Sequence, residues 1–305
     1  MNGVLIIDKP AGMTSHDVVN RVRRILKERS VGHLGTLDPL ATGVLPLVVG
    51  SFTRLAQFYA ASGKTYEGVI RFGFSTDTYD AEGQPTSPFQ AVSLHLEELE
   101  ALAARFRGVI EQTPPPFSAK KIQGIPAYKL ARKHKEVTLS PVQVEVKEFD
   151  ILKAEVDRVT FRARVASGTY MRSVAHDMGQ LMGCGAHLHS LRRTGVAEFV
   201  LADAHTLEDL DSAARNHTVE DMFVHPRKIL HQFPCVTANE EMAARIRSGR
   251  TVNLPEWSKA RQVKVFCGQR ELIAVATRVA GTLFHPKLVL AADPARGIAQ
   301  APRTT

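Results

Sequence analysis

The sequence predicts an α+β protein of two domains. Its 305 residues are enough for a catalytic domain of roughly 200 residues and a smaller second unit. Before residue 225, segments with helical apolar spacing occur among segments rich in β-branched residues. Beyond a linker at 225–234, one helix and several strands within about 60 residues predict a small β-barrel. We therefore expect domains at 1–230 and 235–292 and a disordered tail at 293–305.

Composition narrows the class of protein. The chain carries 39 Lys and Arg against 31 Asp and Glu, a net charge of +8, which favours a polyanionic partner. Three widely spaced cysteines argue against a disulfide framework and indicate a reducing compartment. No apolar run reaches the roughly 18 residues of a membrane span, and the N-terminus lacks the features of a signal peptide. We expect a cytoplasmic protein with no membrane partner.

The first two elements have clear boundaries. GVLIIDKP reads as a short buried strand that stops where Pro10 removes a backbone donor. Thr14 and Asp17 form a predicted capping box, which begins a helix with an apolar stripe made of Val18, Val22, Ile25 and Leu26.

The middle of the chain alternates strands and helices. Strands are predicted in TYEGVIRFG and at 159–165, and TDTYDAEGQP between them reads as a polar turn without calcium-loop spacing. A helix is predicted at 96–108, ended by Gly108. Another starts at TYMRSVAHDMGQLMG, ends near Gly183 and Gly185, and buries Val174, Met178 and Leu181.

The C-terminal unit has one predicted helix and a hairpin. Thr237 and Glu240 form its capping box, and Gly249 ends the helix. QVKVF, the turn CGQR and ELIAVATRV predict a β-hairpin.

The segment GHLGTLDPLATGVLP, residues 32–46, places Asp38 in a turn rich in glycine and proline, beside His33. Loops of this composition position binding and catalytic groups, so the segment predicts an active-site loop. Arg172 falls in the first turn of a predicted helix, where the helix dipole disfavours a cation, and this position indicates an anionic partner.

Residues 113–137 have a different character. They contain six Lys and Arg against one Glu, interrupted by proline and glycine. This composition predicts a mobile basic arm that closes over a phosphate backbone through Lys120, Lys121 and Lys129.

Cys184, His187 and His189 lie close enough in the sequence to suggest a zinc site. Structural zinc takes four ligands with two paired spacings, and the chain has no second pair. We therefore expect no metal site.

Three motifs together resemble the TruB family of tRNA pseudouridine synthases: the aspartate segment, KTY with Tyr66, and GTYMR with Arg172. The resemblance runs from residue 2 to about 200 and resumes in the C-terminal unit. It implies a pseudouridine synthase fold with a mixed, mainly antiparallel central sheet, and a C-terminal PUA-like RNA-binding domain. It also implies a monomer that isomerises uridine 55 in the T loop of tRNA without cofactor or guide RNA.

The chemistry of that reaction fits three residues. Breaking the C1′–N1 bond, turning the base and rejoining it at C5 needs an ionised carboxylate beside the ribose, a cation that keeps it ionised, and a flat surface for the base. Asp38, Arg172 and Tyr66 meet these needs. The residues leave open whether Asp38 attacks C1′ or takes a proton from C2′ to give a glycal.

The resemblance assigns supporting roles to four further residues. His33 supports the RNA stack after the base has flipped, Tyr170 contacts the substrate, and Leu191 packs against the active-site ring. Lys9, with Pro10, props the catalytic loop more than it reacts, and we place Lys9 among the substrate-binding residues.

Each assignment has a structural alternative. Asp38 alone is a turn former, Tyr66 a core residue, Arg172 an exposed helix charge, and His33 a hydrogen-bond partner of its own loop.

The function has alternatives as well. A guide-dependent synthase of ribosomal RNA is disfavoured by the basic arm and by the lack of long lysine-rich tails. A non-catalytic RNA-binding or tRNA-folding protein would bind RNA without releasing tritium from C5-labelled uridine. A nucleoside glycosidase would need a second acid for the leaving group, and no other carboxylate in the sequence has comparable motif support.

Overall fold

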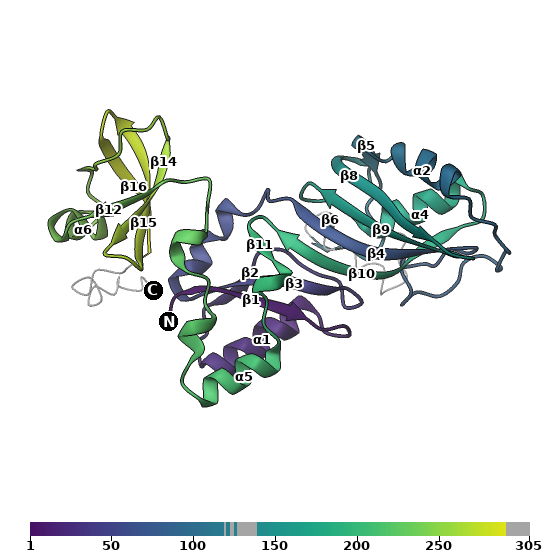
Figure 1. The fold of residues 1–305 in the computed structure, drawn as a ribbon, viewed down its shortest axis with the longest axis horizontal. Coiled ribbons are helices and arrows are strands. Elements are labelled where there is room, and N and C mark those ends of the chain that lie inside the picture. The colour runs from purple at the N-terminus through teal and green to yellow at the C-terminus, as the bar shows by residue number, and fades with distance from the viewer. Residues whose placement is uncertain (119, 123–124, 127–138, 291–305) are drawn as a thin grey trace, which may run out of the picture.

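The computed structural model describes residues 1–118, 120–122, 125–126 and 139–290, and two sheets dominate it (Figure 1). The larger sheet has nine strands: β1 (Gly3–Lys9), β2 (Val31–His33), β3 (Thr42–Val49), β4 (Lys64–Phe72), β5 (Gly108–Gln112), β8 (Val142–Ala154), β9 (Arg158–Val165), β10 (Ala186–Val196) and β11 (Phe199–Val200). Its order is β1-β3-β10-β4-β9-β8-β5, while β2 pairs with β3 and β11 with β10. Only the β3–β10 pairing is parallel. The expected mixed, mainly antiparallel sheet is confirmed.

The parallel contact between β3 and β10 is short and close. It joins Thr42 to Arg192 and Gly43 to Arg193. Gly43 has a φ of +100°, and a Cβ built on it would lie 2.2 Å from the Arg193 carbonyl oxygen. Only glycine fits here, so this residue sets how near the N-terminal strands lie to the rest of the sheet.

Helices α1 (Ser15–Leu26), α2 (Leu96–Ala104) and α4 (Met171–Leu181) contribute to one core with the larger sheet. The capping box of Thr14 and Asp17 is confirmed, and Val18 and Val22 are fully buried. Amphipathic helices of this kind gain most of their stability from that burial.

Two details of these helices were predicted wrongly. Helix α2 ends at Ala104, because the chain turns there and Gly108, with a φ of +87°, begins β5 instead. Leu181 is 49 % exposed. It lies at the end of α4, where Met182 packs against the core in its place.

The smaller sheet contains β12 (Cys235–Ala238), β13 (Val252–Asn253), β14 (Gln262–Cys267), β15 (Glu271–Ala280) and β16 (Leu283–Val289). Its order is β12-β14-β15-β16-β13, and the strands curl into a half-barrel (Figure 1). The predicted hairpin is β14–β15. Helix α6 (Glu240–Arg247) is capped by Asn239, not by Thr237, because Thr237 is committed to β12. Gly249 follows the helix with a φ of +77°, as expected of a stop.

The remaining elements are α5 (Leu207–Arg215), which lies against α1, and the short strands and turns that connect the chain. The 3-10 helices are η1 (Gly50–Phe58), η2 (Leu201–Asp203), η3 (Val219–Met222) and η4 (Pro226–Lys228), and the strands β6 (Lys121–Ile122) and β7 (Ile125–Pro126) pair with each other. No helix in the described part of the chain is long and apolar enough to cross a membrane.

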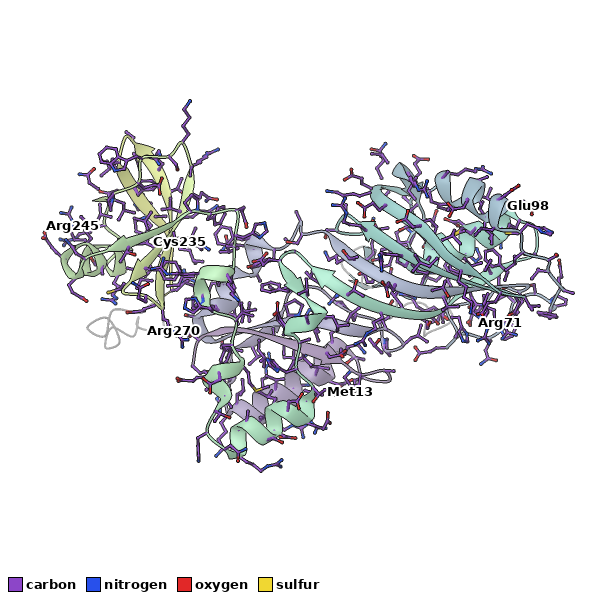
Figure 2. All side chains as sticks on the ribbon, viewed as in Figure 1. Met13, Arg71, Glu98, Cys235, Arg245 and Arg270 are labelled. Atoms are coloured by element: carbon purple, nitrogen blue, oxygen red, sulfur yellow. The ribbon has the colours of Figure 1, made fainter. Side chains whose placement is uncertain are left out.

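The linker at 225–234 packs tightly between the two sheets. Ile229 and Leu230 are fully buried in a second core, to which Phe52 and Val48 contribute from one side and Phe266 and Leu272 from the other. The Lys264 ammonium donates to the Arg227 and Ile229 carbonyls at 2.9 and 2.6 Å. In Figure 2, Cys235, Arg245 and Arg270 mark the end of the molecule that carries the smaller sheet, and Arg71 and Glu98 mark the opposite end.

Parts of two predictions lie outside the described residues. Of the basic arm, residues 119, 123–124 and 127–137, with Lys129, are not among them, and neither is the tail at 293–305. Lys121 lies in β6, and Lys120 directly precedes it.

Candidate active site

A cavity of about 270 Å³ lies beside β4, β10 and the start of α4. Asp38, Tyr66, Tyr170, Arg172 and Leu191 all line it. The remaining lining residues are Gly35, Thr36, Leu37, Lys64, Ser118, Ser167, Gly168, Thr169 and Met171. The three residues expected to carry the chemistry, which are far apart in the sequence, therefore meet in one place.

Asp38 and Arg172 form an ion pair, with Asp38 Oδ2 2.9 Å from Arg172 Nε. The side chain of Arg172 is 5 % exposed and that of Asp38 is 40 % exposed. Despite this short distance, Nε has no hydrogen-bond partner among the described residues. The other guanidinium nitrogens donate to main-chain carbonyls: Nη1 to Thr78 at 3.1 Å and Nη2 to Phe117 at 2.9 Å. The buried cation is thus fixed while the carboxylate stays accessible.

Asp80, in the segment predicted to be a polar turn, is a second carboxylate at Arg172. Its Oδ2 lies 3.7 Å from Arg172 Nη1, and its side chain is 6 % exposed. Its Oδ1 accepts from Thr78 Oγ1 at 2.6 Å and from Glu82 N at 3.1 Å. Electrostatics could have pointed to Asp80, because a buried guanidinium that faces one exposed carboxylate needs further anionic or carbonyl partners.

Residues 35–39, hereafter the aspartate loop, are held along their backbone. The buried Lys9 ammonium donates to the Pro39 carbonyl at 3.2 Å, and also to Pro10 at 2.8 Å and Met13 at 2.6 Å. Burial lowers the pKa of Lys9 to about 8. Lys9 is 0 % exposed, so it supports the loop as expected, whereas its placement among residues that contact the substrate is wrong.

Arg193 holds the other half of the aspartate loop. This role was not predicted from the sequence. This fully buried side chain donates through Nη2 to Gly35 O at 3.0 Å, through Nη1 to Thr36 O at 3.2 Å and through Nε to Val44 O at 2.8 Å. Ser15 Oγ bonds both the N–H and the carbonyl of Leu37. A backbone fixed at this many points holds Asp38 in one orientation, as efficient catalysis requires.

Tyr66 and Leu191 supply the apolar part of the cavity from β4 and β10. Tyr66 is 8 % exposed. Burial is the main effect on its hydroxyl and raises the pKa of Tyr66 above its usual value. The phenol is therefore protonated at neutral pH.

Tyr170 and His33 differ in their relation to the cavity. Tyr170 lines it, and Gln112 fixes its main chain by two hydrogen bonds of 2.8 and 3.1 Å. His33 does not line it. Its Nδ1 accepts a hydrogen bond from Gly35 N at 3.3 Å, and burial lowers the pKa of His33. In this structure His33 therefore bonds its own loop, which was the structural alternative to a role in supporting the RNA.

Two hydroxyls in the cavity wall are buried without a hydrogen-bond partner among the described residues, Ser118 Oγ and Thr169 Oγ1. A buried polar atom without a partner costs roughly 1 to 3 kcal/mol. Together with Arg172 Nε they offer hydrogen bonds to a bound molecule.

Of the three residues considered for zinc, His187 is engaged elsewhere. The His187 ring packs on Phe74 with centroids 4.6 Å apart, and its Nδ1 lies 3.2 Å from the Phe74 carbonyl oxygen. No group of three or more His, Cys, Asp or Glu side chains able to hold a metal occurs in the described part of the chain.

The larger sheet, with the cavity beside it, has the pseudouridine synthase fold. The solved structure of a Cbf5–Nop10–Gar1 complex matches with a TM-score of 0.70 at 24 % identity, covering 95 % of this chain and 85 % of that one. An H/ACA ribonucleoprotein bound to a substrate RNA containing 2′-deoxyuridine matches to the same extent. At this identity the likeness concerns the fold alone.

The sequence comparisons give the family. Residues 23–171 match the TruB family pseudouridylate synthase N-terminal domain, and residues 172–231 match the tRNA pseudouridylate synthase B C-terminal domain. The tRNA pseudouridine synthase B of Solibacter usitatus is 50 % identical over 293 residues, 95 % of this chain and all of the relative. That of Aquifex aeolicus is 37 % identical over 292 residues, with the same coverage. The chain belongs to the TruB family, isomerases that make pseudouridine.

Proposed function

We propose that the protein isomerises uridine 55 in the T loop of tRNA to pseudouridine, with Asp38 as the catalytic group. The observation that carries the proposal is the Asp38–Arg172 ion pair of 2.9 Å at the wall of a cavity that also contains Tyr66 and Leu191. The overall reaction breaks the C1′–N1 bond and forms a C1′–C5 bond. C5 loses a proton and N1 gains one, so the product is an isomer and no oxidant or outside energy is consumed.

Arg172 keeps an anion available next to the ribose. Its guanidinium cannot lose its proton, and its fixed partners Thr78, Phe117 and Asp80 hold it in place. Asp38 can therefore act on the sugar while Arg172 balances its charge, either by attack on C1′ or by removal of a proton from C2′.

Tyr66 and Leu191 provide the surface on which the detached uracil turns. Stacking of a base on an aromatic ring contributes about 1 to 3 kcal/mol. Because the Tyr66 hydroxyl is protonated, it can accept the C5 proton only if it passes its own proton on in the same step.

The RNA must present the uridine in an unstacked form, since a duplex conceals its bases. A net charge of +8 favours binding to the T stem-loop. Within this proposal, residues 1–230 form the catalytic domain, the basic arm at 113–137 clamps the stem-loop through Lys120, Lys121 and Lys129, and the unit at 235–292 reaches toward the acceptor end. The protein acts as a monomer without guide RNA.

The test uses the purified full chain and an unmodified tRNA transcript, with no guide RNA or metal added. We expect one new pseudouridine, at position 55, with tritium release from C5-labelled uridine, and none in a transcript with cytidine at that position. RNA binding without tritium release would instead identify a non-catalytic RNA-binding protein. Turnover only after addition of a guide RNA would identify a guide-dependent enzyme.

A further inference from the structure

We infer that Lys64 forms a phosphate-binding site in the wall of the active-site cavity, for one of the two phosphates that flank the flipped uridine. The inference rests on the proposed function for the identity of the RNA. It concerns the lysine of the KTY segment, of which only the tyrosine has a role so far.

Lys64 lies where a flanking phosphate has to pass. It begins β4 and stands two residues before Tyr66 on the same face of the strand. Two residues span about 6.6 Å of a strand, and both side chains line the cavity that contains Asp38. A nucleotide stacked on Tyr66 therefore brings its backbone within reach of Lys64.

The ammonium is held in position but not saturated. Its Nζ donates to Ser62 O at 2.7 Å and to Ser167 Oγ at 3.2 Å. Ser167 Oγ in turn donates to Ala60 O at 2.9 Å, which orients its lone pairs toward the lysine. An ammonium has three N–H groups, and the third has no acceptor among the described residues.

The charge of Lys64 is also uncompensated. Within the described ranges, Lys64 forms no ion pair within 4.0 Å, and the charged group that acts on its pKa is another cation, Arg193. A Cβ built on Gly35 would lie 3.6 Å from both Lys64 Cε and Arg193 Nη1. Burial and Arg193 both lower the pKa of Lys64. Neither cation forms an ion pair within 4.0 Å in the described part of the chain, which favours an anionic ligand, and a phosphodiester is the anion that every nucleotide carries.

A second donor lies on the neighbouring loop. Thr169 Oγ1, two residues after Ser167, is buried without a partner among the described residues and belongs to the same cavity wall. Lysine as a point charge and a hydroxyl as a hydrogen-bond donor are a common combination for phosphate.

The experiment measures binding of three T stem-loop RNAs to the full chain. One RNA is unmodified, and the other two carry a neutral methylphosphonate in place of the phosphate on the 5′ or on the 3′ side of uridine 55. The variants are Lys64→Met, Lys64→Arg and, as a matched control, Lys153→Met. Lys153 is 65 % exposed and pairs with Glu155.

On the unmodified RNA, Lys64→Met should weaken affinity by about ten- to a hundredfold, the effect of a lost charged hydrogen bond. Its plot of log affinity against log salt should become shallower by about 0.7, the slope of one single-strand phosphate contact. Lys64→Arg should restore the slope, and Lys153→Met should not change it. On one of the two methylphosphonate RNAs, the wild type and Lys64→Met should bind equally.

An equal loss on all three RNAs would overturn the inference, since Lys64 would then act by ordering the 166–169 loop. An unchanged affinity in Lys64→Met would overturn it as well. These are binding measurements, so they are separate from the test of function. If the wild type binds the unmodified RNA without forming pseudouridine, the proposed function fails, and the phosphate site is still judged by the methylphosphonate comparison.

Discussion

The aspartate loop and the linker at 225–234 are each fixed by buried cations that donate to main-chain carbonyls, but the two fixed segments have different consequences. Lys9 and Arg193 hold the aspartate loop, whose Asp38 side chain remains 40 % exposed. Lys264 holds the linker, whose Ile229 and Leu230 are fully buried. In the first case the fixed backbone presents a reactive group, and in the second it joins two sheets. Damage to the first should therefore reduce turnover, and damage to the second should reduce stability.

The largest effect is expected from Asp38→Asn. The amide keeps the shape of the side chain but removes the anion, so turnover should fall by about 10³-fold or more. The unfolding midpoint and the affinity for tRNA should stay close to those of the wild type, because the loop is held by its backbone. Single-turnover kinetics and a binding titration check this, and appreciable activity in the variant would refute the assignment of Asp38.

Lys9→Met should affect both turnover and stability. The carbonyls of Pro10, Met13 and Pro39, which are partly buried, lose their donor, and we expect a loss of about 3 kcal/mol in the free energy of unfolding. Chemical denaturation gives this number. Turnover should fall too, since Asp38 loses part of its support, and a fall in stability with full activity would contradict the proposed role.

The contribution of Lys9 to the free energy of unfolding should depend on pH. The pKa of Lys9 is about 8 in the folded protein and 10.5 in its ordinary state. Between these values the unfolded chain binds a proton that the folded protein does not, so this residue makes stability rise with pH from about 8 to 10.5. The difference between wild type and Lys9→Met, measured across this window, should therefore widen with pH. A constant difference would show that Lys9 has an ordinary pKa.

Lys264→Met tests the second region. The buried carbonyl of Ile229 and the partly buried carbonyl of Arg227 lose their donor, and we expect a loss of about 2 kcal/mol in the free energy of unfolding. Single-turnover rates on a short T stem-loop should not change. A rate that falls together with stability would mean that the linker also supports the active site.

Tyr59→Phe should have the smallest effect. The Tyr59 hydroxyl donates to Glu198 Oε1 at 2.6 Å and accepts from Leu230 N at 2.9 Å. Leu230 N also donates to Glu198 at 2.7 Å, so this amide keeps a partner. We expect a loss of about 1 kcal/mol with unchanged turnover, measured by denaturation of the two proteins side by side.

Much of the fold could be predicted from local pattern. The strand before Pro10, the helix capped by Thr14 and the hairpin near 262–279 follow from propensity and capping, which act over a few residues. The errors arose where tertiary pairing overrides local signals. Thr237 has the right spacing for a cap, but its backbone pairs in β12, so Asn239 takes that role.

The candidate site shows the same limit. Asp38, Tyr66 and Arg172 could be chosen because each belongs to a short motif, and the structure places them in one cavity. Asp80, Arg193 and Lys64 could not, because their importance depends on partners more than 25 residues away that only the folded sheet brings close. Buried charges are visible only once burial is known.

Gly43 has a consequence for how this enzyme tolerates mutation. Its missing Cβ lets β3 touch the main chain of Arg193, the residue whose guanidinium reaches Gly35 and Thr36. A methyl group there would push the strands apart and withdraw that guanidinium from the catalytic segment. A substitution at residue 43 would thus lower turnover as the loss of a catalytic group does, although its effect is steric and the residue is not part of the cavity wall.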